Sequence, residues 1–195
     1  MRKRLTLLAA TVAVAVLTSA CGAWSTAGTS TTEPSVTPSA APTLPPRPRE
    51  VDLTGVDACT LLTPEQQRQI GTDMPPRVSD DPDRYGNFRC HYTKSLSSPR
   101  FGYSVKVVTQ EDATVYLTGE RNMVARVVSA GGFPAVENHP PGNPQGCFVD
   151  VSTKDGQYLS VQYSKSTGSD DTTEVACEKA RTAAELAMQT LLTQR

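Results

Sequence analysis

The sequence predicts an α+β domain in which a single antiparallel β-sheet is covered by an N-terminal and a C-terminal helix and is held by two disulfides. Three observations predict it. Several short segments alternate apolar and polar residues, an Asp-Gly pair separates two of them, and a long alanine-rich segment with helical spacing closes the chain. Alternation at period two is typical of half-buried strands, and a run of strands flanked by helices favours one sheet with helices packed on it.

Alternating segments and turn residues place the strands. Asp155-Gly156 is a strong hairpin signal between two alternating segments. We expect loops at residues 72–86 and 139–144, because both are rich in residues that favour turns. The predicted strands are residues 87–92, 101–108, 123–128, 133–137, 147–152 and 157–163.

Capping residues place the helices. Asp57 caps a short helical turn at residues 57–62. Thr63 and Gln66 form a capping box for a helix that runs to Ile70 and stops at a glycine. The other helical predictions are a short segment at 111–117 and a final helix at 174–192, capped by Thr172 or Thr173.

The first twenty residues have the composition of a signal peptide. Three cations in residues 1–4 precede an apolar run at residues 5–17, which is too short to span a membrane as a stable helix. Small residues then lead into Cys21, and this order resembles a bacterial lipobox, although Thr18 stands where a Leu is usual. The alternative is an ordinary secretory signal with an incidental cysteine. We expect Cys21 to carry a lipid that anchors the chain to the outer face of the cytoplasmic membrane, exposed to the cell wall.

Composition changes again after this cysteine. Residues 21–50 consist mainly of Ser, Thr, Pro, Ala and Gly, which is the composition of a linker. Residues 51–195 carry the alternating and helical segments and are long enough to bury one core. The sequence therefore predicts a lipoprotein signal peptide at 1–20, a tether at 21–50 and one globular domain at 51–195.

The four cysteines of the domain are Cys59, Cys90, Cys147 and Cys177. An even number in an exported domain predicts disulfides. Of the three possible connectivities we favour Cys59–Cys90 with Cys147–Cys177, because each pair joins a helix to a nearby strand within one half of the chain. The separations of 31, 57 and 30 residues do not match the paired ligands of zinc sites. We predict no metal site and no cofactor.

The sequence has none of the standard hydrolase or phosphate-loop motifs. Its histidines and clustered aspartates also lie at positions that do not favour catalysis. His91 alternates outward on a strand and His139 precedes two prolines in a loop, so we expect surface histidines and not general bases. Asp80, Asp81 and Asp83 lack EF-hand spacing and indicate a solvated acidic loop more than a calcium site. Eight aromatic residues are expected mainly in the core, with a ligand groove as the alternative; they are Tyr85, Tyr92, Tyr103, Tyr116, Tyr158, Tyr163, Phe88 and Phe101.

The net charge of the chain argues against nucleic acid as a partner. Nineteen Lys and Arg against twenty Asp and Glu give a net charge of -1, so no broad basic field attracts nucleic acid. Apart from the membrane through Cys21, the expected partner is an envelope protein, a cell-wall glycan or a small apolar ligand. We expect a binding or interaction module without catalytic activity, whose ligand-binding residues the sequence does not reveal. The alternative is an envelope hydrolase or transferase with an unrecognised active site.

Four segments together carry a family resemblance. They are DACTLLTPE at residues 57–65, Cys90-His91-Tyr92, Gly146-Cys147 before a hairpin, and Cys177-Glu178-Lys179-Ala180 in the last helix. With the lipobox and the tether, they resemble the actinobacterial lipoproteins grouped as domain of unknown function 3558 (DUF3558). The resemblance covers about residues 52–193. It implies a surface lipoprotein and offers no catalytic residues to carry over.

Overall fold

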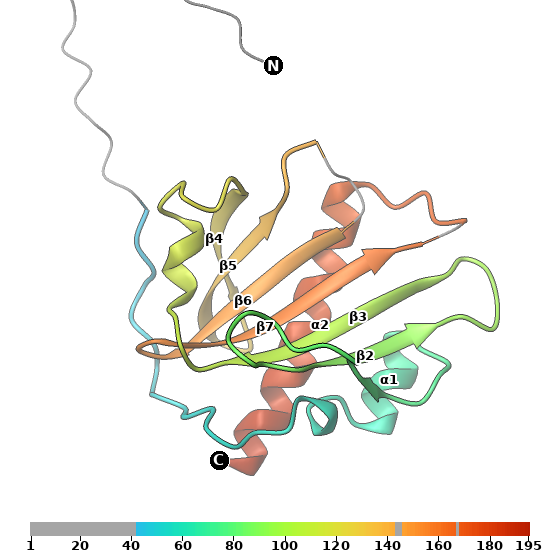
Figure 1. Ribbon diagram of the computed structural model, residues 1–195, viewed down its shortest axis with the longest axis horizontal. Coiled ribbons are helices and arrows are strands. Elements are labelled where there is room, and N and C mark those ends of the chain that lie inside the picture. The colour runs from blue at the N-terminus through green and yellow to red at the C-terminus, as the bar shows by residue number, and fades with distance from the viewer. Residues whose placement is uncertain (1–41, 143–145, 167) are drawn as a thin grey trace, which may run out of the picture. The chain divides into compact units, whose positions relative to one another are not determined.

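A seven-stranded antiparallel sheet forms the centre of the domain in the computed structural model, which describes residues 42–142, 146–166 and 168–195 (Figure 1). The strand order is β1-β2-β3-β7-β6-β5-β4. The strands are β1 (Arg77–Val78), β2 (Arg89–Lys94), β3 (Phe101–Val108), β4 (Val124–Ala130), β5 (Phe133–His139), β6 (Gly146–Lys154) and β7 (Gln157–Lys165). The predicted fold class is confirmed, whereas Cys21, the signal peptide and most of the tether lie outside the described residues.

Every predicted strand is present, and the structure adds one. Arg77 and Val78 pair with His91 and Cys90, so β1 lies inside the segment predicted as loop. Two residues are too few to show alternation, which is why β1 has no signature in the sequence. At the other predicted loop, β5 extends two residues further than expected and ends at His139.

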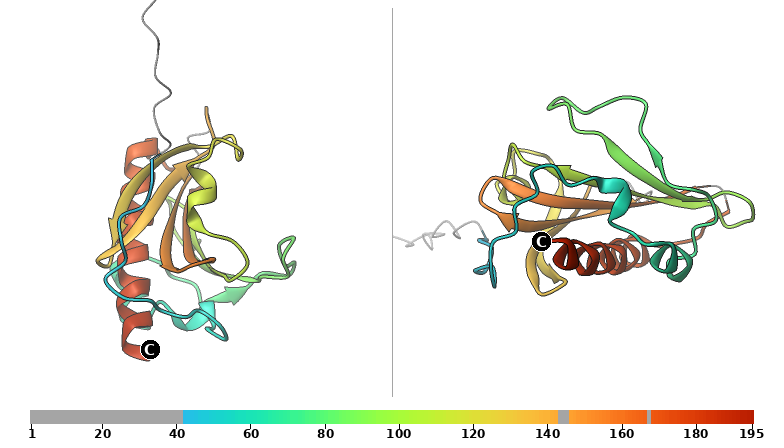
Figure 2. Two further views of the ribbon diagram at one scale, coloured as in Figure 1. Left: turned by 90° about the vertical axis from the view of Figure 1, so that its left-hand side faces the viewer. Right: turned by 90° about the horizontal axis from the view of Figure 1, so that it is seen from below.

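Two α-helices and two 3-10 turns complete the domain: η1 (Ala58–Thr60), α1 (Pro64–Gln69), η2 (Ala113–Tyr116) and α2 (Thr173–Gln194). The predicted capping box is present, because Thr63 and Gln66 exchange side-chain to backbone hydrogen bonds. Thr172 caps α2. Both α-helices lie on the same side of the sheet (Figure 2), and the Gln66 side chain donates to the Leu186 carbonyl at 2.9 Å, which ties α1 to α2.

The core fills the space between α2 and the sheet. Alternate residues of each strand point toward the helix, as period-two geometry requires, and the helix contributes alanines that let it approach closely. The largest fully buried side chains of this layer are Tyr92, Tyr163, Leu53, Leu61, Leu62, Leu159, Met188, Leu191, Val51 and Val105. Tyr92, Tyr103 and Tyr163 therefore pack in this layer, as expected. Tyr158 is also buried, but in a second cluster with Val108, Ala113 and Val136.

Two disulfides join helical segments to the sheet. Cys59 of η1 bonds to Cys90 of β2, and Cys147 of β6 bonds to Cys177 of α2, with Cα–Cα distances of 5.1 and 4.9 Å. This is the connectivity favoured from the sequence. The bonds clamp the two ends of the domain's core.

The described end of the tether packs on the domain. Leu44 contacts the apolar cluster around Tyr158, and the Arg47 guanidinium donates to Ser152 at 2.9 Å and pairs with Asp155. Residues of the segment that composition assigns to the tether therefore pack on the domain. Among the described residues, no helix is long and apolar enough to cross a membrane.

Candidate functional site

The face of the sheet opposite α2 carries polar side chains in two cross-strand rows. Because facing residues of neighbouring strands point to the same side, the register places each row on one line across the sheet. The first row is Arg89, Lys106, Ser160, Asp150 and Val136, and the second is His91, Ser104, Gln162, Phe148 and Asn138. The predicted outward direction of His91 is confirmed by this arrangement.

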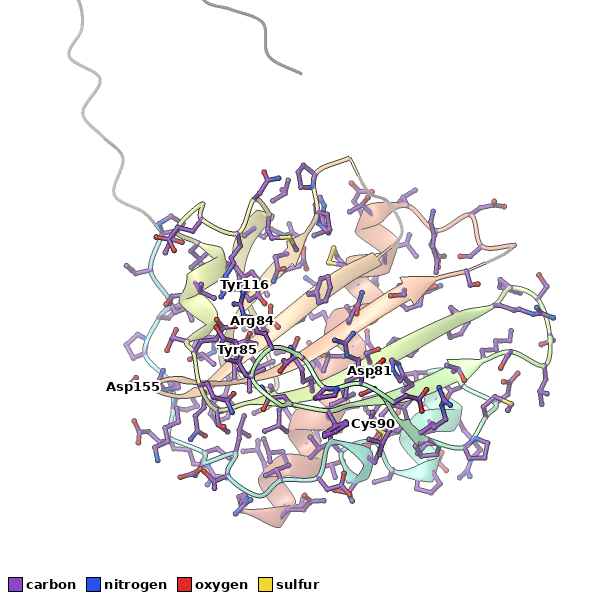
Figure 3. All side chains as sticks on the ribbon, in the orientation of Figure 1. Asp81, Arg84, Tyr85, Cys90, Tyr116 and Asp155 are labelled. Atoms are coloured by element: carbon purple, nitrogen blue, oxygen red, sulfur yellow. A yellow bond between two sulfur atoms is a disulfide. The ribbon has the colours of Figure 1, made fainter. Side chains whose placement is uncertain are left out.

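Two segments cover parts of this face and leave a gap between them. One is the loop at residues 79–88, which rises in front of the sheet in Figures 1 and 2, and the other contains η2. They meet at the Glu111 carboxylate. Glu111 accepts hydrogen bonds from Tyr85 Oη at 3.2 Å and Tyr158 Oη at 2.9 Å, and it pairs with Arg84 and Arg121. In Figure 3, Arg84 and Tyr85 of the loop appear next to Tyr116 of η2.

A small cleft lies on this face beside η2, with a volume of about 60 Å³. We call it the sheet-face cleft, and its lining residues are Arg89, Ser104, Lys106, Tyr116, Phe148, Ser160 and Gln162. Two of the seven are cations and none is a carboxylate. The cleft opens beside an outer pocket of about 290 Å³ that shares Arg89 and includes His91 and Asp81. The lining therefore offers hydrogen-bond donors on one side and an aromatic wall on the other.

A buried carboxylate lies in the same row as the cleft. Asp150 is fully buried and accepts a hydrogen bond from Asn138 Nδ2 at 2.7 Å. Among the described residues, the remaining oxygens, Asp150 Oδ1 and Asn138 Oδ1, have no hydrogen-bond partner. Burial raises the pKa of Asp150 to about 6, against the opposing hydrogen bond from Asn138. Such a perturbed group beside a cleft is typical of functional sites and also occurs in structural networks.

The charges at the rim are largely paired. Asp83 in the 79–88 loop pairs with Lys106 at 2.8 Å. Burial disfavours its charged form, but the hydrogen bonds from Lys106 and the Asn87 backbone outweigh burial and lower the pKa of Asp83 to about 2. Asp80 pairs with Arg77 at 3.2 Å. The two ion pairs neutralise Asp80 and Asp83. The acidic segment is therefore a surface loop, as predicted, and these two carboxylates do not form a cation site.

The structure brings one serine and one histidine together. Ser104 Oγ lies 3.0 Å from His91 Nδ1 across the β2–β3 pair. Burial, followed by the charges of Arg89 and Arg77, lowers the pKa of His91, so the ring is neutral at pH 7. A serine nucleophile also needs its histidine oriented by a third group. No carboxylate among the described residues hydrogen-bonds to His91, because Asp80 faces Arg77 instead.

His139 lies elsewhere and makes a local contact. Its Nδ1 is 3.1 Å from the Pro140 carbonyl oxygen, at the end of β5. A ring nitrogen at this distance from a carbonyl is its hydrogen donor, so Nδ1 is not free to take a proton from a nucleophile. His139 is the last residue of β5, so the expectation of a turn residue is wrong, because the strand continues up to the Pro140-Pro141 pair.

A second depression, the apolar groove, has a volume of about 320 Å³. It lies between the segment at residues 53–59 and the ends of β2 and β3, over the Cys59–Cys90 disulfide. Phe88 and Val78 line it, and each is 50% exposed. Phe88 is therefore the one residue of the predicted aromatic set that presents a large, open apolar surface to a groove in the described chain.

Among the described residues, three side chains of kinds that can bind a metal lie together, but they form a disulfide and an ion pair instead. Glu137 lies with Cys147 and Cys177, their potential ligand atoms within 4.8 Å of one another. The two sulfurs are joined in a disulfide, and the buried Glu137 carboxylate pairs with Arg126. A disulfide lacks the thiolates that bind metals, so this cluster is a structural ion pair beside a crosslink.

The sequence indicates that His91, which lines the outer pocket, faces outward, but it does not identify the residues of the cleft. Alternation alone indicates that Lys106, Gln162 and Asp150 avoid the core, and this is the signal that was present. It does not show that β3, β7 and β6 are neighbours, because the β3–β7 pair joins segments about fifty residues apart. The site appears only when the strand order is known.

Fold and site together define a disulfide-clamped α+β domain whose sheet is covered by helices on one face and bears a polar cleft on the other. The family model for the protein of unknown function DUF3558 matches residues 16–190. The chain therefore belongs to the DUF3558 family. No curated protein and no solved structure shows significant similarity to it.

Proposed function

We propose that the protein is a lipid-anchored binding module on the outer face of the cytoplasmic membrane, exposed to the cell wall. The sheet-face cleft carries this proposal: Arg89 and Gln162 line it, and no ion pair or side-chain hydrogen bond among the described residues engages either side chain. Unengaged polar groups converging on a rigid cleft are the usual features of a ligand site. The lipobox, the tether and the disulfides support an envelope location.

Anchoring is tested at Cys21. The Cys21→Ser variant has no thiol to receive a diacylglycerol, so we expect it to be released from the membrane or to accumulate as an unprocessed precursor. Detergent-phase partition of natural and variant chains measures the difference. A variant that partitions into detergent as fully as the natural chain shows that Cys21 is not the anchor.

Binding is tested with the full chain in detergent micelles. The probes are soluble cell-wall fragments and a lipid extract, and the readout is saturable change in the NMR resonances of cleft residues such as Gln162 and Phe148. Resonance changes confined to Phe88 and Val78 would show that the ligand binds in the apolar groove and not in the cleft. If neither probe perturbs either region, the binding proposal fails.

The Ser104–His91 contact favours the second candidate, an envelope hydrolase. We expect no turnover of ester, peptide or glycoside substrates, because the histidine lacks an orienting carboxylate. Mass spectrometry of the same mixtures measures this. Products that accumulate with the natural chain and vanish in both Ser104→Ala and His91→Ala, but persist in the exposed Ser129→Ala control, would replace binding by catalysis.

A further inference from the structure

We propose that the sheet-face cleft binds a small oxyanion, the carboxylate or phosphate group of an envelope ligand, with Arg89 as its principal contact. This inference rests on the binding function proposed above and adds the chemical class of the group that is bound. The positions and partners of the charged side chains around the cleft carry it.

Arg89 differs from the cations beside it. Arg77 pairs with Asp80 and Lys106 pairs with Asp83. Arg89 is half-buried on β2, and its backbone bonds to Ser79 in both directions: its N–H donates to Ser79 Oγ at 3.2 Å, and its carbonyl accepts from the Ser79 N–H at 2.8 Å. Among the described residues, its guanidinium has no hydrogen-bond or ion-pair partner. Its guanidinium therefore keeps five donors in a planar fork that matches a carboxylate or phosphate.

The other lining groups suit an anion in number and kind. Ser104, Ser160 and Tyr116 supply hydroxyls, Gln162 supplies an amide, and the Lys106 ammonium adds positive charge. None of the lining residues is acidic. Phe148 forms the wall against which the carbon skeleton of a ligand would pack. A volume of about 60 Å³ holds a group the size of roughly two water molecules, which selects a compact headgroup.

Acidic groups near the cleft do not occupy it. Asp80 and Asp83 are paired as described, and Asp81 lines the outer pocket and not the cleft. Asp150 is fully buried in the same cross-strand row and is not among the residues that line the cleft. The lining itself therefore carries two cations and no carboxylate, and this composition favours an anion.

The test is an NMR titration of the full chain in detergent micelles with sodium acetate, with inorganic phosphate, and with sodium chloride at matched ionic strength. We expect acetate or phosphate to shift the Gln162 side-chain amide and the Ser104 resonances saturably, while chloride does not. Stronger binding of acetate identifies a carboxylate ligand, and stronger binding of phosphate identifies a phosphate ligand. Equal responses to chloride and to both oxyanions would overturn the proposal, because they would report ionic strength alone.

Variants separate the guanidinium from charge in general. Arg89→Gln is expected to weaken anion binding by at least about tenfold, since a hydrogen bond to a charged group contributes that much. Arg89→Lys keeps the charge, loses the fork, and is expected to weaken binding less. Arg100→Gln, at an exposed arginine outside the cleft, is the matched control and should bind as the natural chain does. Arg89→Lys also decides the matter if Arg89→Gln fails to fold.

Two results distinguish the oxyanion proposal from the proposed binding function on which it rests. If wall fragments or lipids shift the cleft resonances and Arg89→Gln binds them unchanged, the oxyanion proposal is wrong and the binding module stands. If no envelope fraction perturbs the cleft or the apolar groove, the binding function itself is wrong.

Discussion

Replacing both cysteines of the Cys147–Cys177 disulfide by alanine is expected to lower the free energy of unfolding by about 4 to 5 kcal/mol. The bond closes a loop of 30 residues, and the chain-entropy model assigns about 3 to 4 kcal/mol to a loop of that length. Both cysteines are also buried in the core, so their truncation removes packing worth about 1 kcal/mol more. Urea unfolding of the natural and variant chains measures the loss.

The other disulfide provides the matched control. Cys59–Cys90 closes a loop of 31 residues, so its entropic contribution is the same, but Cys59 is only half-buried. We expect its double alanine variant to lose about 3 to 4 kcal/mol. A larger loss at Cys59–Cys90, or a loss below about 1 kcal/mol at Cys147–Cys177, would contradict this ordering.

Local signals account for the elements that could be predicted. The Thr63–Gln66 capping box, the Asp155-Gly156 turn and the cap of α2 at Thr172 each depend on residues a few positions apart, and each is present as expected. The disulfide pairing could be predicted because each bond joins segments about thirty residues apart within one half of the chain. β1 was missed because a two-residue strand has no period to detect.

Non-local pairing explains why the cleft could not be predicted. The sequence shows that Arg89 and Gln162 alternate away from the core, but it does not show that β3 pairs with β7 or that β7 pairs with β6 in the register that forms the two rows. Glu111 is a second example. It lies in a short segment with no motif, yet its carboxylate joins Tyr85 of the loop at residues 79–88 to Tyr158 of β7.

The burial of Asp150 could not be predicted from the sequence either. Between Val149 and Val151, an aspartate on a strand suggests an exposed position, because charged residues are rarely buried without a partner. The tether and η2 cover this part of the sheet, and the side chain is fully buried with one oxygen unpartnered among the described residues. Only the tertiary arrangement shows that this carboxylate lowers the stability of the fold in its charged form.

The Asp150→Asn variant is expected to be the more stable protein at pH 7 and to lack a pH dependence of about 2 kcal/mol that the natural chain shows between about pH 4 and pH 7. Burial raises the pKa of Asp150 to about 6 from the value of 3.8 for an unperturbed aspartate. The native state therefore binds more protons than the unfolded state between these two values. The free energy of unfolding falls as the pH rises through this window, by about 2 kcal/mol between pH 4 and pH 7, and is level above about pH 7.

Asparagine supplies N–H donors where the natural chain needs a bound proton, so the variant keeps its stability across this window. Denaturant unfolding of both chains at several pH values gives the difference between them, which cancels the titration of all other groups. Asp83→Asn is the control of opposite sign: the pKa of Asp83 is lowered to about 2, so its charge stabilises the native state at neutral pH and its loss should destabilise the protein there. A difference between the natural chain and Asp150→Asn that stays constant from pH 4 to pH 7 would show that Asp150 does not titrate in this range, because only a proton bound to the buried carboxylate makes that difference depend on pH.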